Sequence, residues 1–162
     1  MNSSKNLSKQ SGVMLLEALI AILIFSMGIL ALIGMQAIAI SSTTDSKSRA
    51  DASYLANQII GQMWLENRGN PPAAATLQAN LIAYSHQPNN GGAACAPNGG
   101  ASTHANVSAW LNRVAAALPG AVADKQQIIV DTAANNLVTV RLCWQDPQDK
   151  APRNFVVITN IN

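Results

Sequence analysis

A long apolar run lies near the start of the chain. Between residues 13 and 40 only Glu17, Ser26 and Gln36 carry polar side chains, and residues 18–35 hold no charge. About twenty apolar residues in a helix span the ~30 Å hydrocarbon core of a bilayer. A core helix of a soluble protein would be shorter and would have a polar face. The run therefore predicts a membrane-spanning helix.

The same helix is expected to continue beyond the apolar run. The sequence becomes polar at Ser41, and apolar residues then recur at spacings of three and four, the period of one helix face. These residues are Ala52, Leu55, Ala56, Ile59, Ile60 and Met63. Gly69 and the prolines at 71 and 72 are typical helix-stop residues. We predict one helix over about residues 13–67, with two helices broken near 41–44 as the alternative.

The middle of the chain predicts one further helix. Residues 69–103 read as a long loop rich in Pro, Gly and Asn, with a short helical turn around 76–84. The stretch STHANVSAWLNRVAAALPG then shows a helical apolar stripe, and its Pro119-Gly120 pair ends that helix. The stripe consists of Val107, Trp110 or Leu111, Val114 and Leu118.

The last third of the chain changes to the period of β-strands. Three runs, QQIIVDT, LVTVRLCWQD and NFVVITNI, are β-rich, and Asn135-Asn136 predict a hairpin between the first two. In the second run, side chains alternate between the two faces of the strand. The face toward the helix is expected to carry Val138, Val140, Leu142 and Trp144. The opposite face is expected to carry Thr139, Arg141 and Cys143. The predicted fold class is α+β, a long N-terminal helix packed on a C-terminal antiparallel sheet of three or four strands.

The charge of the chain is small and unevenly placed. The 162 residues suffice for one domain with a modest core and carry a formal net charge of +2. Lys5 and Lys9 precede the apolar run, so the positive-inside tendency predicts a cytoplasmic N-terminus and an exported part after residue 40. The other basic residues are scattered and are expected to be solvated, with no nucleic-acid footprint. They include Lys47, Arg49, Arg68, Arg113, Arg141 and Arg153.

The start of the apolar run combines a cleavage-like signal with an acidic residue. The segment SGVMLLE has a leader ending at Gly12, an apolar Val13, and Glu17 as the fifth residue after Gly12. It resembles the signal of type IV prepilins and of the pseudopilins of type II secretion. The resemblance implies a leader over residues 1–12, cleavage after Gly12 by the membrane-embedded prepilin peptidase, and methylation of the new N-terminus at Val13. That family usually has Phe at the first mature position, where this chain has Val13.

A conventional secretory signal peptide is the alternative for this region. It would use the basic start and the AIA triplet at 37–39. The apolar run is far longer than the usual stretch of about 7–15 residues, and an uncompensated Glu17 would be costly in hydrocarbon. We expect Glu17 to pair with the free amine of Val13, one helical turn away, or with the N-terminus of a neighbouring subunit. Such pairing would penalise wrong axial registers in a filament.

A second resemblance covers much of the remaining chain. The segment AWLNRVAAALPGA, followed by a strand ending VTVRLCW, is similar to minor pilins of the PilV type. It implies the type IV pilin fold, with residues 13–40 as the transmembrane half of the helix and 41–162 as a periplasmic head. The implied function is structural: initiation of pilus assembly in the inner membrane, followed by a place near the tip of the extracellular pilus.

The same resemblance implies a set of partners. They are the prepilin peptidase, other minor pilins, the major pilin and the inner membrane, with no small-molecule substrate and no cofactor. A minor pseudopilin of type II secretion or competence is the first alternative. A single-span membrane protein with a periplasmic binding head is the second.

The two cysteines fit an exported head. Cys95 lies in the irregular segment and Cys143 in the second strand run. Outside the cytoplasm a disulfide between them is expected, and closing a loop of about fifty residues contributes about 4 kcal/mol in the chain-entropy description. Two free thiols are the alternative, and two cysteines are too few for a metal site.

No arrangement of residues predicts catalysis. His86 and His104 are isolated in the sequence and are expected to be solvated polar residues. Asp146 and Asp149 flank Pro147 in a predicted turn, for which calcium binding is the alternative use. We therefore expect a structural protein and no enzyme.

Overall fold

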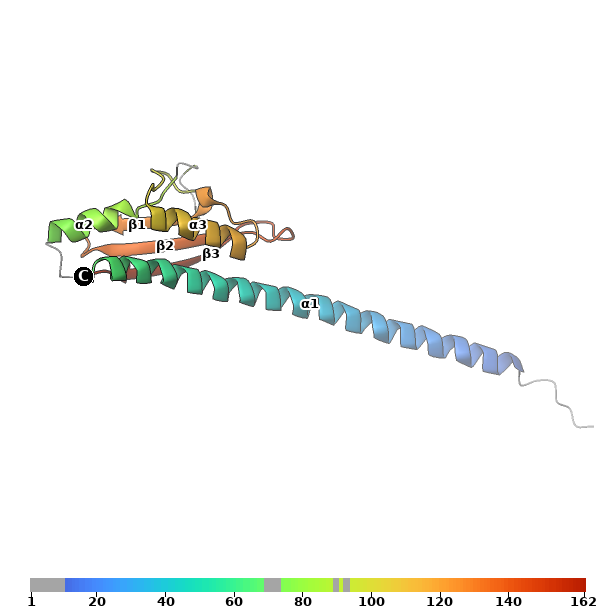
Figure 1. Ribbon diagram of the computed structural model, residues 1–162. Helices are drawn as coiled ribbons and strands as arrows, with labels where there is room; N and C mark the ends of the chain where they lie inside the picture. The colour runs from blue at the N-terminus through green and yellow to red at the C-terminus, as the bar shows by residue number, and fades with distance from the viewer. Residues whose placement is uncertain (1–10, 69–73, 89–90, 92–93) are drawn as a thin grey trace, which may run out of the picture. The chain divides into compact units, whose positions relative to one another are not determined.

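The computed structural model describes residues 11–68, 74–88, 91 and 94–162. The chain divides into two units, Met1–Asp45 and Ser46–Asn162, and we call the second unit the head. The elements in chain order are α1 (Ser11–Glu66), α2 (Ala74–Ala83), α3 (Ala105–Ala117), the 3-10 helix η1 (Ala123–Lys125), β1 (Gln127–Asp131), β2 (Leu137–Trp144) and β3 (Arg153–Asn160) (Figure 1). This is the α+β arrangement expected from the sequence, with three strands.

α1 is continuous from the apolar run into the head, so the prediction of one helix is confirmed and the two-helix alternative is wrong. Its N-terminal part is long and apolar enough to cross a membrane. The hydroxyl of Ser26 in this part donates to the Ile22 carbonyl at 2.7 Å, so it needs no partner outside the helix. The predicted stop residues 69, 71 and 72 and the leader residues Lys5 and Lys9 lie outside the described residues.

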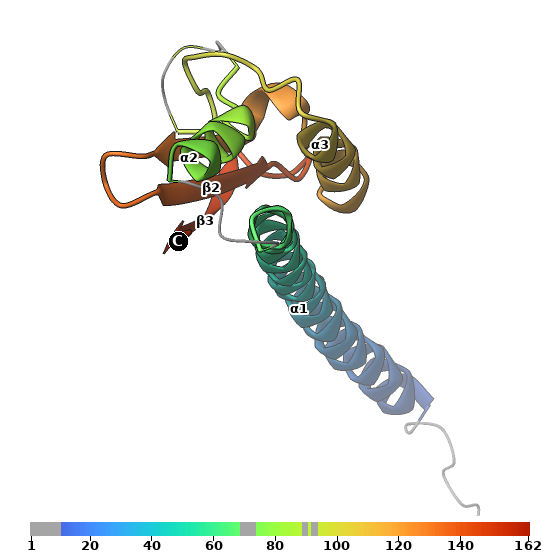
Figure 2. The same cartoon turned by 60° about the vertical axis from the view of Figure 1, so that its left-hand side comes forward.

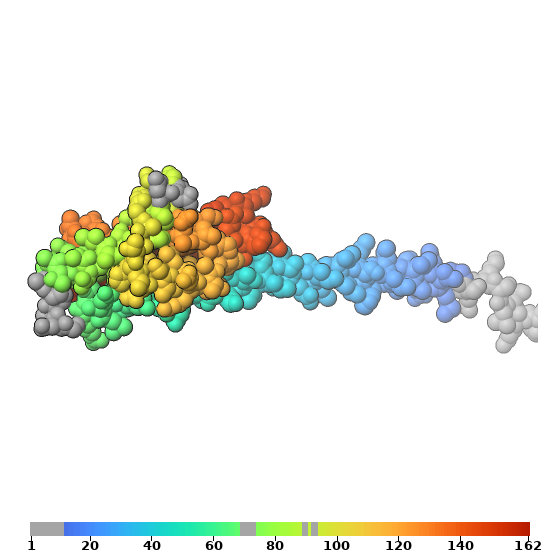
Figure 3. All heavy atoms as spheres, turned by 45° about the horizontal axis from the view of Figure 1, so that its top comes forward, coloured from blue at the N-terminus to red at the C-terminus, as the bar shows by residue number. Residues whose placement is uncertain are grey.

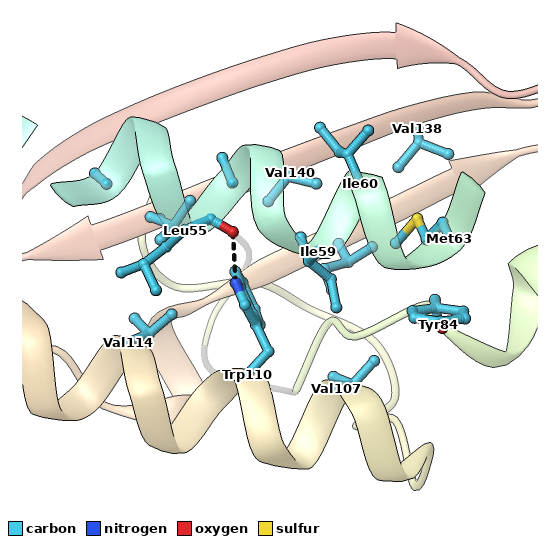
Figure 4. Packing of buried hydrophobic residues seen from close by; sticks show 14 of the residues in the cluster. Leu55, Ile59, Ile60, Met63, Tyr84, Val107, Trp110, Val114, Val138 and Val140 are labelled. Carbon is cyan, nitrogen blue, oxygen red and sulfur yellow. Dashed lines mark hydrogen bonds between the residues drawn. The ribbon is translucent and has the colours of Figure 1, made fainter. Parts of the chain in front are cut away.

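The head is organised around the apolar stripe of α1. All six predicted stripe residues are buried, together with side chains of α2, of α3 and of one sheet face. Between the two candidates on α3, Trp110 is fully buried and Leu111 only half-buried. The Trp110 indole Nε1 donates to the Leu55 carbonyl oxygen at 2.9 Å and so joins α3 to α1 (Figure 4). Figure 2 shows the end of α1 below α2 and α3, beside β2 and β3.

The sheet is antiparallel, in the order β1-β2-β3. The predicted alternation on β2 is confirmed, because Val138, Val140, Leu142 and Trp144 are all fully buried. The hairpin between β1 and β2 uses Asn135 and Asn136 in the left-handed region, at φ 56° and 52°, which asparagine tolerates better than most residues. His86 adds a single bridge to Ile128 at the outer edge of β1.

The segment before α3 is more regular than the sequence indicates. The short turn expected around residues 76–84 is the helix α2, which begins at Ala74. It buries Leu81, and Tyr84 just after it is also fully buried. The Asn80 amide nitrogen donates to the Asn67 amide oxygen at 3.1 Å. Tertiary contacts of this kind stabilise a helix that is too short to form alone.

Two arginines are not the solvated residues that the sequence analysis expects. Arg141 is half-buried on the outer sheet face, where its Nη1 donates to the Gln127 amide oxygen at 3.0 Å. Arg153 donates to both carboxylate oxygens of Asp149, at 2.7 and 2.9 Å. These hydrogen bonds hold the pKa of Asp149 below its usual value. The cation that Asp149 binds in the turn after β2 is therefore a side chain of β3.

Gly120, just after α3, requires a glycine for two reasons. Its φ is 61°, and a Cβ at this position would lie 2.5 Å from the Gln145 carbonyl oxygen. The chain approaches this closely because the Gln145 amide donates to the Pro119 carbonyl at 2.9 Å. The space-filling view shows the turn after β2 beside the end of α3 (Figure 3).

We predict that Gly120→Ala lowers the free energy of unfolding by about 2 kcal/mol or more, through left-handed strain and overpacking. The matched control is Gly61→Ala, because Gly61 lies inside α1 with nothing within 4 Å of the added Cβ. It is expected to raise stability by up to about 1 kcal/mol. Urea denaturation of the detergent-solubilised chain measures both. Equal effects of the two substitutions would contradict the strain at Gly120.

Candidate functional site

The residues with predicted roles in processing and assembly lie in the first turns of α1. Gly12 and Val13 follow directly on Ser11, the first residue of the helix. Both are exposed, and Val13 exposes 65% of its surface. Glu17 is also exposed and lies one turn after Val13. The structure thus places the three residues together on the first turns of one helix, while cleavage, methylation and pairing stay predictions.

Glu17 is an acidic group in an apolar neighbourhood. Its neighbours on α1 are large exposed hydrophobic side chains, namely Leu15, Leu16, Leu19 and Ile20. Among the residues that the structure describes, none forms a hydrogen bond or an ion pair with Glu17. A carboxylate near a helix N-terminus is favoured by the helix dipole, but in hydrocarbon it still needs a cationic partner. The arrangement can therefore bind a positively charged group near the start of α1.

The predicted disulfide is present in the head. Cys95 and Cys143 are bonded at an S–S distance of 2.01 Å and lie 48 positions apart in the sequence. Cys143 is the exception on the outer face of β2, because the disulfide and the segment around Cys95 bury it. The side-chain amide of Gln126 also contacts this strand end. It accepts from the Cys143 N–H and donates to the Cys143 carbonyl, both at 2.9 Å.

A polar cluster of four side chains joins the end of α1 to the start of α3. We define it as Glu66, Tyr84, His104 and Asn106. The Tyr84 hydroxyl donates to Glu66 Oε2, and Asn106 Nδ2 donates to the Tyr84 oxygen at 2.9 Å. The imidazole of His104 lies 4.2 Å from the Tyr84 ring, and its Nε2 lies 3.6 Å from Glu66 Oε1. The cluster closes the helical side of the core with polar contacts.

His104 also caps α3, so the expectation of a solvated residue is wrong. Its ring accepts a hydrogen bond from the Asn106 N–H at 3.3 Å, as an N-cap side chain does. Its position directly before a predicted helix was the available sequence signal. Histidine is not among the preferred N-cap residues, and the signal was therefore weak.

The expectation for His86 is wrong as well. Its side chain is buried, with 3% of the residue surface exposed. Its Nδ1 accepts from the Ser102 N–H, and its Nε2 lies against the Ala123 carbonyl oxygen, each at 3.1 Å. Its backbone forms the bridge with Ile128. No periodic pattern indicates this burial, because each partner lies in a different segment of the chain.

Comparison of the chain with models of known protein families, with curated proteins and with solved structures finds no match. Among the residues that the structure describes, no group of three or more His, Cys, Asp or Glu side chains is placed to hold a metal ion.

The polar cluster predicts a loss of stability in alkali. Burial, and then the hydrogen bond to Glu66, raise the pKa of Tyr84 from 10.0 to about 12. A folded-state pKa above the unfolded value means that folding disfavours the tyrosinate. The contribution of Tyr84 is therefore complete below pH 10 and is lost as the pH rises toward 12.

We predict that the stability difference between the wild type and Tyr84→Phe narrows by about 1–2 kcal/mol between pH 9 and pH 12. The phenylalanine variant serves as the reference because other groups titrate equally in both proteins. Urea denaturation at several pH values gives both free energies of unfolding. A difference that does not vary with pH would show that folding does not raise the pKa of Tyr84.

Proposed function

We propose that the chain is a structural minor pilin. In this proposal residues 13–40 insert in the inner membrane, and prepilin peptidase removes residues 1–12. The processed subunit then joins other minor pilins in a complex that initiates a type IV pilus, and it stays near the tip of that pilus. The observation that carries the proposal is the continuity of α1. One helix holds Glu17 in its exposed apolar part and the core stripe of the head in its other part.

Processing after Gly12 would supply a cationic partner for Glu17. The new amine at Val13 carries a positive charge one turn before the Glu17 carboxylate, within reach of that subunit or of a neighbour. In an apolar surrounding such a pair is worth much more than in water, and a carboxylate left alone is costly. Subunits that stack in the wrong axial register leave this charge unpaired. Glu17 would therefore select the register at which α1 enters the filament.

The head is consistent with a subunit that works outside the cytoplasm. It holds a disulfide, and disulfides persist in oxidising compartments. The apolar side chains of α1, α2, α3 and the sheet pack in one core. The head would therefore move as one body with its part of α1 when the subunit enters a filament.

A minor pseudopilin of type II secretion or competence would share the same start of α1. A strain that lacks this chain separates the two systems, since loss of pili with normal secretion supports the minor pilin. Loss of secretion with normal pili supports the pseudopilin. A competence pseudopilin predicts loss of DNA uptake alone, and a single-span protein with a periplasmic binding head predicts that pili, secretion and DNA uptake are all normal.

The first prediction concerns the N-terminus. Intact-mass spectrometry of the chain purified from membranes should show a first residue at Val13, with or without one added methyl group. A strain without prepilin peptidase is the control and should yield the unprocessed chain. An N-terminus at Met1 in the presence of the peptidase, or at Ile40, would contradict the proposal, the latter by indicating an ordinary signal peptidase.

The second prediction concerns Glu17. We predict that Glu17→Val leaves membrane insertion and processing unchanged but lowers the amount of the chain in sheared pili at least about tenfold, because the register charge is lost. Gln36→Val is the matched control, since it places the same residue at another polar position of the apolar run. It should enter pili normally. Normal incorporation of the Glu17 variant would overturn its assigned role.

A further inference from the structure

The sheet of the head has two edges, and one of them is covered by the chain itself. At β1 the His86 N–H donates to the Ile128 carbonyl at 2.9 Å, and the Ile128 N–H donates to the His86 carbonyl at 2.8 Å. β3 forms the other edge and ends beside the C-terminus of the chain (Figure 2). An edge strand presents backbone N–H and carbonyl groups at strand spacing, and these groups can bind another strand. β3 is therefore the place where the sheet could be extended.

The ladder between β2 and β3 determines which backbone groups of β3 point away from the sheet. Pairs in an antiparallel ladder alternate between hydrogen-bonded and non-hydrogen-bonded. The Ile161 N–H donates to the Asn136 carbonyl at 3.2 Å, one position beyond the last pair of the ladder, so the odd-numbered residues of β3 bond to β2. The bridge at Ile128 gives the same alternation when it is followed across β1 and β2. The even-numbered residues of β3 therefore direct their N–H and carbonyl groups to the free edge.

Free backbone groups and exposed apolar side chains occur together on this edge. Among the residues that the structure describes, none outside the ladder with β2 forms a hydrogen bond with the backbone of residues 154–158. Val156 and Ile158 lie on the outer sheet face and expose 37% and 61% of their surface. β3 contains no Lys and no Pro, and its eight residues pair with β2 without a bulge. The features that usually protect an edge strand are therefore missing from β3.

The geometry of the head argues against a second copy of this chain as the source of an added strand. The β1 edge of a second copy is blocked by the bridge between His86 and Ile128. Two β3 strands that pair about a twofold axis are antiparallel. Because α1 runs lengthwise beside the strands in the head, the head parts of the two α1 helices would then point in opposite directions (Figure 1). Copies that enter a membrane from one side through this helix must share one direction.

We propose that the free edge of β3 binds an extended strand of a different exported polypeptide. The added strand would pair with the outward backbone groups of the even-numbered residues of β3 and extend the three-stranded sheet by one strand. Its side chains would cover Val156 and Ile158 on the outer face. The covered edge at β1 limits the addition to the β3 side.

The side chains of β3 define the chemistry of the added strand. The outer face of β3 carries, in order, Asn154, Val156, Ile158 and Asn160. Residues directly opposite one another in a ladder pack together, so the added strand has apolar residues at its centre and uncharged polar residues at its ends. The one charged residue of β3 is Arg153, which precedes this stretch and is bonded to Asp149. β3 thus offers no counter-charge to a charged residue at the centre of the added strand.

The test uses a synthetic peptide, KKNFVVITN, in which two lysines for solubility precede the sequence of residues 154–160. Read in the antiparallel direction, this peptide repeats the polar, apolar, apolar, polar order of β3, and it lacks α1. Amide hydrogen exchange of the full chain in detergent micelles is measured with the peptide added up to about 1 mM. The amides of Val156 and Ile158 should exchange at least about tenfold more slowly with the peptide than without it. The amide of Val157 should not respond, because it already bonds to β2.

Two controls each remove one backbone donor from the proposed ladder. Proline in place of the isoleucine of the peptide removes an N–H that would point at β3, and it should abolish the slower exchange. In the chain, Val156→Pro removes an N–H from the free edge and no bond to β2, a position at which an edge strand tolerates proline. This variant should lose the peptide response of Ile158. Val156→Ala is its matched control, since it retains the N–H and should keep that response.

Exchange that is unchanged at the highest peptide concentration would overturn the proposal, as would an equal response to the proline peptide. Slow exchange of Val156 and Ile158 in the chain without peptide would also overturn it, since the edge would then be covered already. Should Val156→Pro fail to fold, the two peptides decide the question on the wild-type chain. These measurements require neither processing after Gly12 nor pili, so a negative result would leave the proposed function unaffected.

Discussion

Burial of the α1 stripe against the sheet is the interaction on which the head depends. α1 carries two patterns along one backbone: its first part is long and apolar enough to cross a membrane, and its second part packs one side on the core. The residue pattern changes accordingly, from apolar at nearly every position to apolar at spacings of three and four. β2 contributes four fully buried side chains to the core that contains this stripe, and α3 contributes Trp110. The α1 stripe, the sheet and α3 each bury an apolar face in this shared core, so none of the three could do so without the other two.

Polar side chains complete the head where regular structure ends. Gln126 bonds the last part of β2, the His86 ring contacts the backbone of Ser102 and Ala123, and the polar cluster joins the ends of helices. In each case a side chain forms a hydrogen bond with a backbone group or a carboxylate that has no partner within the sheet or the helices. Such polar groups cost free energy when they are buried without a hydrogen-bond partner. These contacts therefore favour the one arrangement of the apolar elements in which every such group is paired.

The sequence predicts the periodic features well because periodicity is a local property. The α1 stripe, the α3 stripe and the alternation on β2 can each be read from one segment, and each is confirmed. α2 was underestimated because its helix depends on contacts with other segments. The expectation for His86 is wrong for the same reason, since the Ser102 and Ala123 groups that hold it are brought to it only by folding, whereas His104 caps α3 locally as a residue type that is rare at this position. For Glu17 the sequence and the structure carry the same information, because its expected partner belongs to a processed or neighbouring chain.

The amide of Gln126 has a consequence for what the disulfide attaches. It occupies the place that a neighbouring strand would take opposite Cys143, and it fixes that residue through both backbone groups. Cys143 is thus positioned by contacts that do not involve its sulfur. The disulfide therefore attaches the segment around Cys95 to a residue that the Gln126 amide already holds by its backbone.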